Sequence, residues 1–208
     1  MLTGERGFSP LSSHIRSHHG LRSFAFMVAC AVVLTWWGGQ AVLFPNMGGA
    51  EPVPASGAAF MPLLLAIGVP VSTIDGMGDF SKAAALPRRR VRALHLAGAF
   101  GVAVLLACAA LLVSGDLDTL PLALRNLLGF TGLAGVSAAI LGFRLSWLLP
   151  LVQTVPAFLL GTPGMGGAEA QWWEWPRASM ESGLAWGMAT ALMAGGTFLT
   201  VLCGDRRG

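Results

Sequence analysis

Six apolar stretches, separated by short polar connections, constrain the fold of this chain more than any other feature of its sequence. A helix that crosses a membrane needs about 20 consecutive, mostly apolar residues. The stretches cover residues 24–43, 58–71 (or 58–74), 91–113, 122–143, 146–161 and 183–203; the fifth is short and contains Pro150 and Pro156. The sequence therefore predicts an all-α integral membrane protein with six transmembrane helices.

The basic residues are distributed very unevenly around these stretches. Eleven of the 13 fall in segments that would share one side of a membrane if every stretch crosses it, and only Arg125 and Arg177 lie near the other side. Basic connections are retained in the cytoplasm, so we predict that both termini are cytoplasmic. The predicted domains are an amphipathic cytoplasmic leader (1–23), a six-helix transmembrane domain (24–203) and a cytoplasmic tail (204–208).

The composition agrees with a chain that is solvated by membrane lipid. Charged residues make up 11% of the sequence, whereas a soluble domain contains about 25%. The net charge of +3 comes from the cytoplasmic connections and does not indicate a nucleic-acid partner. Cys30, Cys108 and Cys203 all lie in apolar stretches, without the spacing of a disulfide framework or a metal site.

The sequence offers little catalytic chemistry at membrane depth. All ten acidic residues lie in connections or at helix ends, which argues against a proton-coupled carrier because such a protein needs ionisable groups inside the bilayer. Ser137 follows Gly135 in a Gly-Val-Ser-Ala sequence similar to the serine turn of a rhomboid protease, but no histidine follows His95. We instead expect small residues such as Gly129 and Gly132 to let helices pack closely, within one subunit or between two.

The connection between the second and third stretches is the most informative polar segment. Asp79 or Ser81 could cap a short helix that ends before Pro87. We predict that this coupling helix lies under the membrane and docks a cytoplasmic partner. Its docking residues are Asp75, Asp79, Phe80, Ser81, Lys82 and Leu86, and the cytoplasmic anchor that follows is Arg88, Arg89, Arg90 and Arg92. A plain basic connection would explain the arginines but not a capped helix that exposes Phe80 and Leu86.

The last outer connection, residues 162–182, is rich in tryptophan. Trp172, Trp173 and Trp175 favour the membrane interface because their rings are apolar and their N–H groups need partners. They would lie on an ordinary connection or on short re-entrant helices before the sixth helix. Arg125 and Asn126 lie a few residues into the fourth stretch, near the same side, and with the three tryptophans they form a predicted outer gate or pathway.

Arg125 has two interpretations that the sequence leaves open. Its long side chain could reach the outer headgroups as an anchor. It could instead pair with an outer carboxylate and hold the outer connections over the exit of a pore. The carboxylates available for such a pair are Asp116, Asp118, Glu169 and Glu174.

Taken together, this layout resembles the membrane (permease) subunit of a type-2 ABC exporter. That family has six spans, cytoplasmic termini, a basic amphipathic segment before the first span and a coupling helix between spans two and three. Here those elements would be residues 8–23 and 75–87, with residues 162–182 as the re-entrant segment. The Arg125–Gly129 run and the tryptophan-rich connection also look like small permeases of this class.

The resemblance implies which partners and cofactors to expect. The chain contains no GxxxxGK[ST] phosphate loop, so we expect no cofactor and no enzymatic activity in this chain. ATP and Mg²⁺ would bind in a separate cytoplasmic ATP-binding subunit. A second permease subunit, the same or a sister chain, would complete the translocation pathway in the plasma membrane.

Two alternatives of a different class stay open. One is a membrane-embedded enzyme or a heme-handling subunit, which would use histidines such as His14, His18 and His19. The other is a structural membrane protein that transports nothing. An ATPase that co-purifies would favour the exporter, whereas heme absorbance would favour the heme-handling subunit.

Overall fold

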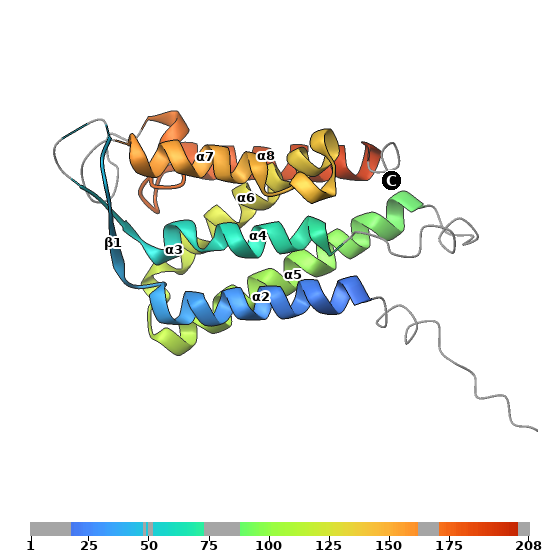
Figure 1. Cartoon of the computed structure of the whole chain (residues 1–208), viewed down its shortest axis with the longest axis horizontal. Helices are drawn as coiled ribbons and strands as arrows, with labels where there is room; N and C mark the ends of the chain where they lie inside the picture. Colours follow the sequence, from blue (N-terminus) through green and yellow to red (C-terminus); the bar gives the residue numbers. More distant parts are fainter. Residues whose placement is uncertain (1–17, 48, 50–51, 73–87, 162–170, 204–208) are drawn as a thin grey trace, which may run out of the picture.

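The computed structural model describes residues 18–47, 49, 52–72, 88–161 and 171–203. In these residues the chain forms a bundle of helices with a small β-hairpin at one end (Figure 1). The α-helices are α2 (His18–Trp37), α3 (Gly57–Phe60), α4 (Pro62–Val71), α5 (Arg88–Ser114), α6 (Leu120–Leu141), α7 (Leu148–Leu159) and α8 (Gly183–Cys203). Short 3-10 turns cover Leu117–Thr119, Phe143–Leu145 and Trp172–Glu174.

Three helical segments are long and apolar enough to cross a membrane: Arg92–Ser114, Leu117–Leu141 and Gly183–Leu202. Three further apolar helical segments are shorter: Leu21–Trp37, Gly57–Val71 and Phe143–Leu159. The prediction of a largely helical, membrane-compatible chain is therefore confirmed. The six apolar segments overlap the six predicted stretches, with the largest differences at the end of the first, which is Trp37 and not residue 43, and at the start of the fourth, which is Leu117 and not residue 122.

The helices run in alternating directions along the bundle (Figure 1). One end of the bundle holds the first residues of α2 and α5 and the last residues of α4 and α8. We call it the basic end because Arg22, Arg89 and Arg90 are exposed near it. The β-hairpin and the Trp172–Glu174 turn lie at the opposite end, which we call the hairpin end. The helix ends at the basic end are thus those that flank the predicted cytoplasmic connections, and the helix ends at the hairpin end are those that flank the predicted outer connections.

α6 is the central helix of the bundle, and most of its residues are buried, whereas most residues of α5 and α8 are only partly buried or exposed. α6 and α8 approach so closely that a Cβ at Gly196 would lie 2.1 Å from the carbonyl oxygen of Gly132. Small residues allow this backbone contact. Gly132 and Gly196 therefore let two helices of the same subunit pack closely, which is one of the two roles that we predicted for the small residues.

The outer surface of the bundle is apolar along its length. Large hydrophobic side chains on α5 point outward, among them Leu94, Leu105 and Val113. So many exposed large hydrophobic side chains are unfavourable in water and suit lipid.

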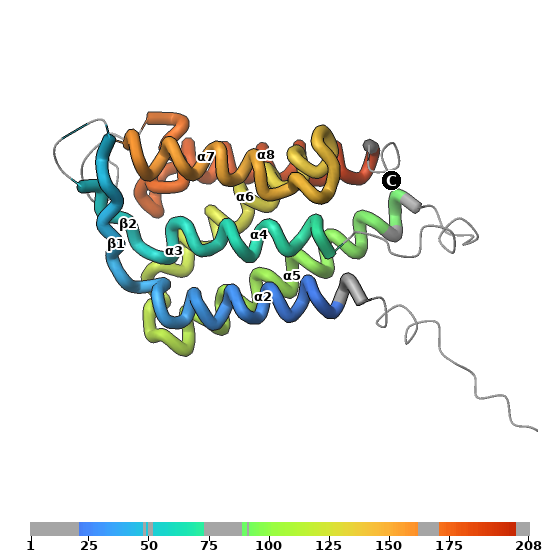
Figure 2. The backbone as a smooth tube through the Cα atoms, in the orientation of Figure 1, coloured from blue at the N-terminus to red at the C-terminus, as the bar shows by residue number. Residues whose placement is uncertain are grey.

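The β-hairpin corrects the purely helical expectation. α2 ends at Trp37, and Ala41–Phe44 (β1) pairs antiparallel with Val53–Ser56 (β2), with Val42 opposite Ala55 (Figure 2). Residues 41–43, which we predicted as the end of the first helix, are therefore in a strand. Gly38 and Gly39 disfavour helix continuation, and the amide N–H of Ala58 bonds the carbonyl of Gly38 at 2.8 Å, which fixes the turn.

Candidate functional site

Arg125 is the centre of a polar cluster buried at the hairpin end of the bundle. It lies in the second turn of α6 and is 0% exposed. Its guanidinium donates from Nη1 to the carbonyls of Ala178 (3.0 Å) and Ser179 (2.8 Å), and from Nη2 to the carbonyl of Pro176 (3.2 Å). Nε donates to Oδ1 of Asn126 at 3.1 Å. The fork of arginine donors is therefore filled mainly by backbone carbonyls of the segment that precedes α8.

This geometry contradicts the headgroup-anchor interpretation of Arg125 and tests the carboxylate-pair interpretation in part. A headgroup anchor would expose the guanidinium, which is fully buried. Among the described residues, the guanidinium bonds backbone carbonyls and the amide oxygen of Asn126 and forms no pair with Asp116, Asp118 or Glu174. The fourth candidate, Glu169, lies outside the described residues. Backbone carbonyls carry no sequence signature, so neither hypothesis could have included them.

Asn126 joins a third segment to the cluster. Its Nδ2 donates to the carbonyl of Ala59 in α3 at 2.6 Å and to the carbonyl of Pro176 at 2.7 Å. Two adjacent residues of α6 therefore bind α3 on one side and residues 176–179 on the other. We call Arg125 and Asn126 the carbonyl clamp.

Trp175 fills the space beside the clamp with its indole ring. The side chain is 1% exposed and packs on Phe130, with 5.3 Å between the ring centroids. A Cβ at Gly129 would lie 2.3 Å from Cη2 of this ring, so glycine leaves the room that the ring occupies. The tryptophan that we predicted at the membrane interface is therefore part of the protein core.

Glu174 and Arg177 form a second buried polar pair next to the clamp. Nη1 of Arg177 lies 3.3 Å from Oε2 of Glu174 and donates to the carbonyl of Ala157 in the last turn of α7 at 3.2 Å. Burial lowers the pKa of Arg177, and the negative charge of Glu174 opposes that shift. A cation is favoured at this position because the last carbonyls of a helix carry partial negative charge.

The other two tryptophans have different environments. Trp172 is 65% exposed, as expected for a side chain at the membrane interface. Trp173 is half-buried against a small core formed by Ala55, Ala59, Ala157 and Phe158. Its carbonyl accepts a short hydrogen bond from Nε2 of Gln153. The described part of the outer connection, residues 171–182, contains one 3-10 turn, Trp172–Glu174. Residues 162–170 lie outside the described residues, so the re-entrant helices stay a prediction.

The predicted cytoplasmic sites are described only in part. The docking residues Asp75, Asp79, Phe80, Ser81, Lys82 and Leu86 lie outside the described residues. Arg88 begins α5, and Arg89 and Arg90 are exposed in its first turn. Arg92 is half-buried and donates to the carbonyl of Val201 in α8 at 3.5 Å, so one anchor residue also connects two helices.

Three residues in or beside this cluster were not predicted as site residues: Gln153, Glu174 as the partner of Arg177, and Arg177 itself. Arg177 could have been identified from the sequence, because it lies three residues after the oppositely charged Glu174 in a segment that also contains Trp175 and Pro176. Among the described residues, no group of three or more His, Cys, Asp and Glu side chains could hold a metal ion. The cluster is suited to holding a segment in place and offers no nucleophile with an activating base.

Comparisons with protein families, with curated proteins and with solved structures found no match for this chain.

Proposed function

We propose that this chain is the transmembrane subunit of an ATP-driven exporter of the type-2 ABC class. In this proposal it crosses the plasma membrane six times, with the basic end in the cytoplasm. The observation that carries the proposal is the grouping of helix ends. The start of α2, the end of α4, the start of α5 and the end of α8 share the end that exposes Arg89 and Arg90, as the positive-inside rule requires of a multi-span protein.

The apolar exterior supports a lipid environment for the bundle. The shorter segment Gly57–Val71 would be about 22 Å long as a helix, less than the roughly 30 Å of a bilayer core. Local thinning of the bilayer accommodates a short span at modest cost. The hairpin and the carbonyl clamp would then cover the outer end of this span.

ATP hydrolysis is assigned to a partner in this proposal. A cytoplasmic ATP-binding subunit, carrying ATP and Mg²⁺, docks on residues 75–86, and the arginines at the start of α5 anchor that segment at the membrane surface. A second permease subunit completes the pathway. The carbonyl clamp holds residues 176–179 at the outer end of the pathway, so it serves as the outer gate.

Co-purification tests the proposal directly. An affinity-tagged chain, extracted in mild detergent, should recover a protein with magnesium-dependent ATPase activity. The double variant Asp79→Ala, Phe80→Ala should recover much less of it. Trp172→Ala is the matched control, because it removes an exposed aromatic side chain from the opposite end and should recover as much as the wild type.

Two results would count against the proposal. Recovery of the chain without any ATPase would remove the exporter assignment and favour a structural membrane protein. Equal recovery by the wild type and the double variant would show that residues 79 and 80 do not dock the partner.

A further inference from the structure

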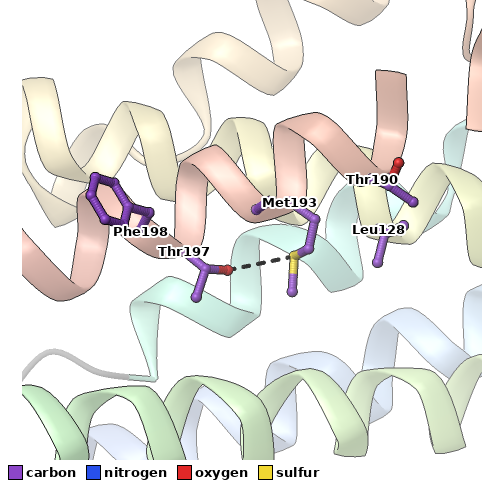
Figure 3. Close-up of a pocket in the computed structure, with 6 residues that line it drawn as sticks. Leu128, Thr190, Met193, Thr197 and Phe198 are labelled. Carbon is purple, nitrogen blue, oxygen red and sulfur yellow. Dashed lines mark hydrogen bonds between the residues drawn. The ribbon is translucent and has the colours of Figure 1, made fainter. Parts of the chain in front are cut away.

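A groove runs along the exposed side of α8, around the middle of that helix, from Thr190 to Phe198. It is shallow and open on one side, with a volume of about 480 Å³. Leu128 of α6 and residues of α8 line it: Thr190, Met193, Ala194, Thr197 and Phe198 (Figure 3). None of these side chains is charged, so the groove suits a neutral, largely apolar occupant.

A narrow crevice of about 20 Å³ adjoins the groove, deeper in the bundle. Met193 and Thr197 border both spaces, and α4, α5 and α6 close the crevice with Val69, Leu96 and Thr131. A space of this size holds a single water-sized group. The crevice can therefore accept the polar end of a molecule whose body lies in the groove.

Thr131 supplies an unused hydrogen-bonding group to the crevice. The residue is 6% exposed, and its Oγ1 has no hydrogen-bond partner in the part of the chain that the structure describes. The nearby hydroxyls differ in this respect: Thr200 donates to the carbonyl of Gly196 (2.8 Å), and Thr190 to that of Trp186 (2.9 Å). A buried hydroxyl without a partner is costly, so a ligand that bonds it gains affinity.

We propose that the groove and crevice together bind a neutral, single-chain amphiphile from the membrane, with a terminal hydroxyl group bonded to Thr131. The apolar chain would lie along α8 between Thr190 and Phe198. A fatty carboxylate or a phospholipid headgroup does not fit, because the lining contains no charge to pair with it and an unpaired charge at this depth is expensive. This inference rests on the proposed exporter function, because it names the class of molecule that the exporter would transport.

Photolabelling of the purified full chain tests this site. The probes are a long-chain alcohol that carries a photoreactive diazirine and the matching diazirine hydrocarbon without the hydroxyl, each used below saturation. The alcohol should label the α8 segment 190–198 in the wild type about three- to tenfold more than the hydrocarbon does, the factor expected of one hydrogen bond.

Thr131→Val should remove this preference and leave the fold intact, because valine keeps the shape and removes a hydroxyl that has no partner. Thr190→Val is the matched control. It removes a groove hydroxyl that is already bonded to its own helix, and it should keep the preference for the alcohol.

Equal labelling of the wild type by both probes would overturn the proposal, because it would show that the alcohol makes an adventitious lipid contact only. An unchanged preference in Thr131→Val would also overturn it. A cross-link between two copies through Ala194→Cys that excludes the alcohol would assign the groove to a second copy instead. Labelling requires no ATPase, so a preference for the alcohol in a chain that recovers no ATPase would refute the exporter function and leave the site standing.

Discussion

Replacing Arg125 by methionine removes every donor of the guanidinium and keeps a long apolar side chain. In the described residues, the carbonyl of Ala178 and Oδ1 of Asn126 then lose the donor that Arg125 gave them. The carbonyls of Pro176 and Ser179 each keep a second donor, from Asn126 and from the amide of Ser182. The variant therefore leaves two buried acceptors without a partner.

The cost can be estimated from these two groups. A buried acceptor without a donor costs about 1–3 kcal/mol, so two cost about 2–6 kcal/mol. Methionine avoids the cost of burying a guanidinium, and we expect a net loss of about 2–4 kcal/mol. Every 1.4 kcal/mol is a factor of ten, so the opening of residues 176–179 should become about 30 to 700 times more frequent.

Cysteine accessibility measures this opening. Ala178 is buried, so Ala178→Cys should react slowly with a membrane-impermeant maleimide in intact cells or oriented vesicles. The rate should rise at least tenfold when Arg125→Met is added. Met180→Cys is the control, because Met180 is exposed and should react at the same rate in both backgrounds.

An unchanged rate at position 178 in the Arg125→Met background would refute the clamp. If the clamp also controls the exit of a pathway, Arg125→Gln should reduce export while assembly stays intact. Arg125→Lys should restore export only in part, since lysine lacks the planar fork that reaches several carbonyls at once. Full export by Arg125→Gln would restrict the clamp to a structural role.

Two glycine substitutions test the packing around the clamp and the central helix pair. Gly129→Ala places a Cβ 2.3 Å from the ring of Trp175, and we expect the free energy of unfolding to fall by about 1–3 kcal/mol. This loss should appear as a lower melting temperature in detergent. The control Gly98→Ala, with nothing within 4 Å of the new Cβ, should melt like the wild type. Gly132→Ala meets the backbone of Leu192 at 2.2 Å and should separate α6 from α8, with a larger fall in melting temperature than Gly195→Ala, whose Cβ has open space. Equal melting temperatures within either pair would contradict the packing described here.

Much of the helical framework could be predicted from apolar stretches alone. The sixth stretch was placed at residues 183–203, and α8 spans Gly183–Cys203. The third and fourth stretches agree with α5 and α6 to within three residues at each end. Lipid-facing helices are long, apolar and flanked by polar residues, so their composition determines their position.

The first stretch shows where composition fails. Residues 41–44 are apolar, and an apolar run is compatible with a helix or with a strand. The hairpin depends on pairing with residues 53–56 and on the turn at Gly38, neither of which composition encodes. The same holds for the site: Arg125 and Asn126 could be identified as unusual polar residues in an apolar helix, but their carbonyl partners are set by the path of the backbone.

The proposed function requires that the predicted docking segment and the outer connection beside the clamp lie on opposite sides of a membrane. Reporter fusions after Lys82 and after Gly166 test it in one experiment, with an alkaline phosphatase that is active outside and a fluorescent protein that folds inside. We predict an inside signal at Lys82 and an outside signal at Gly166. An outside signal at Lys82, or the same side for both positions, would contradict the topology and with it the proposed function.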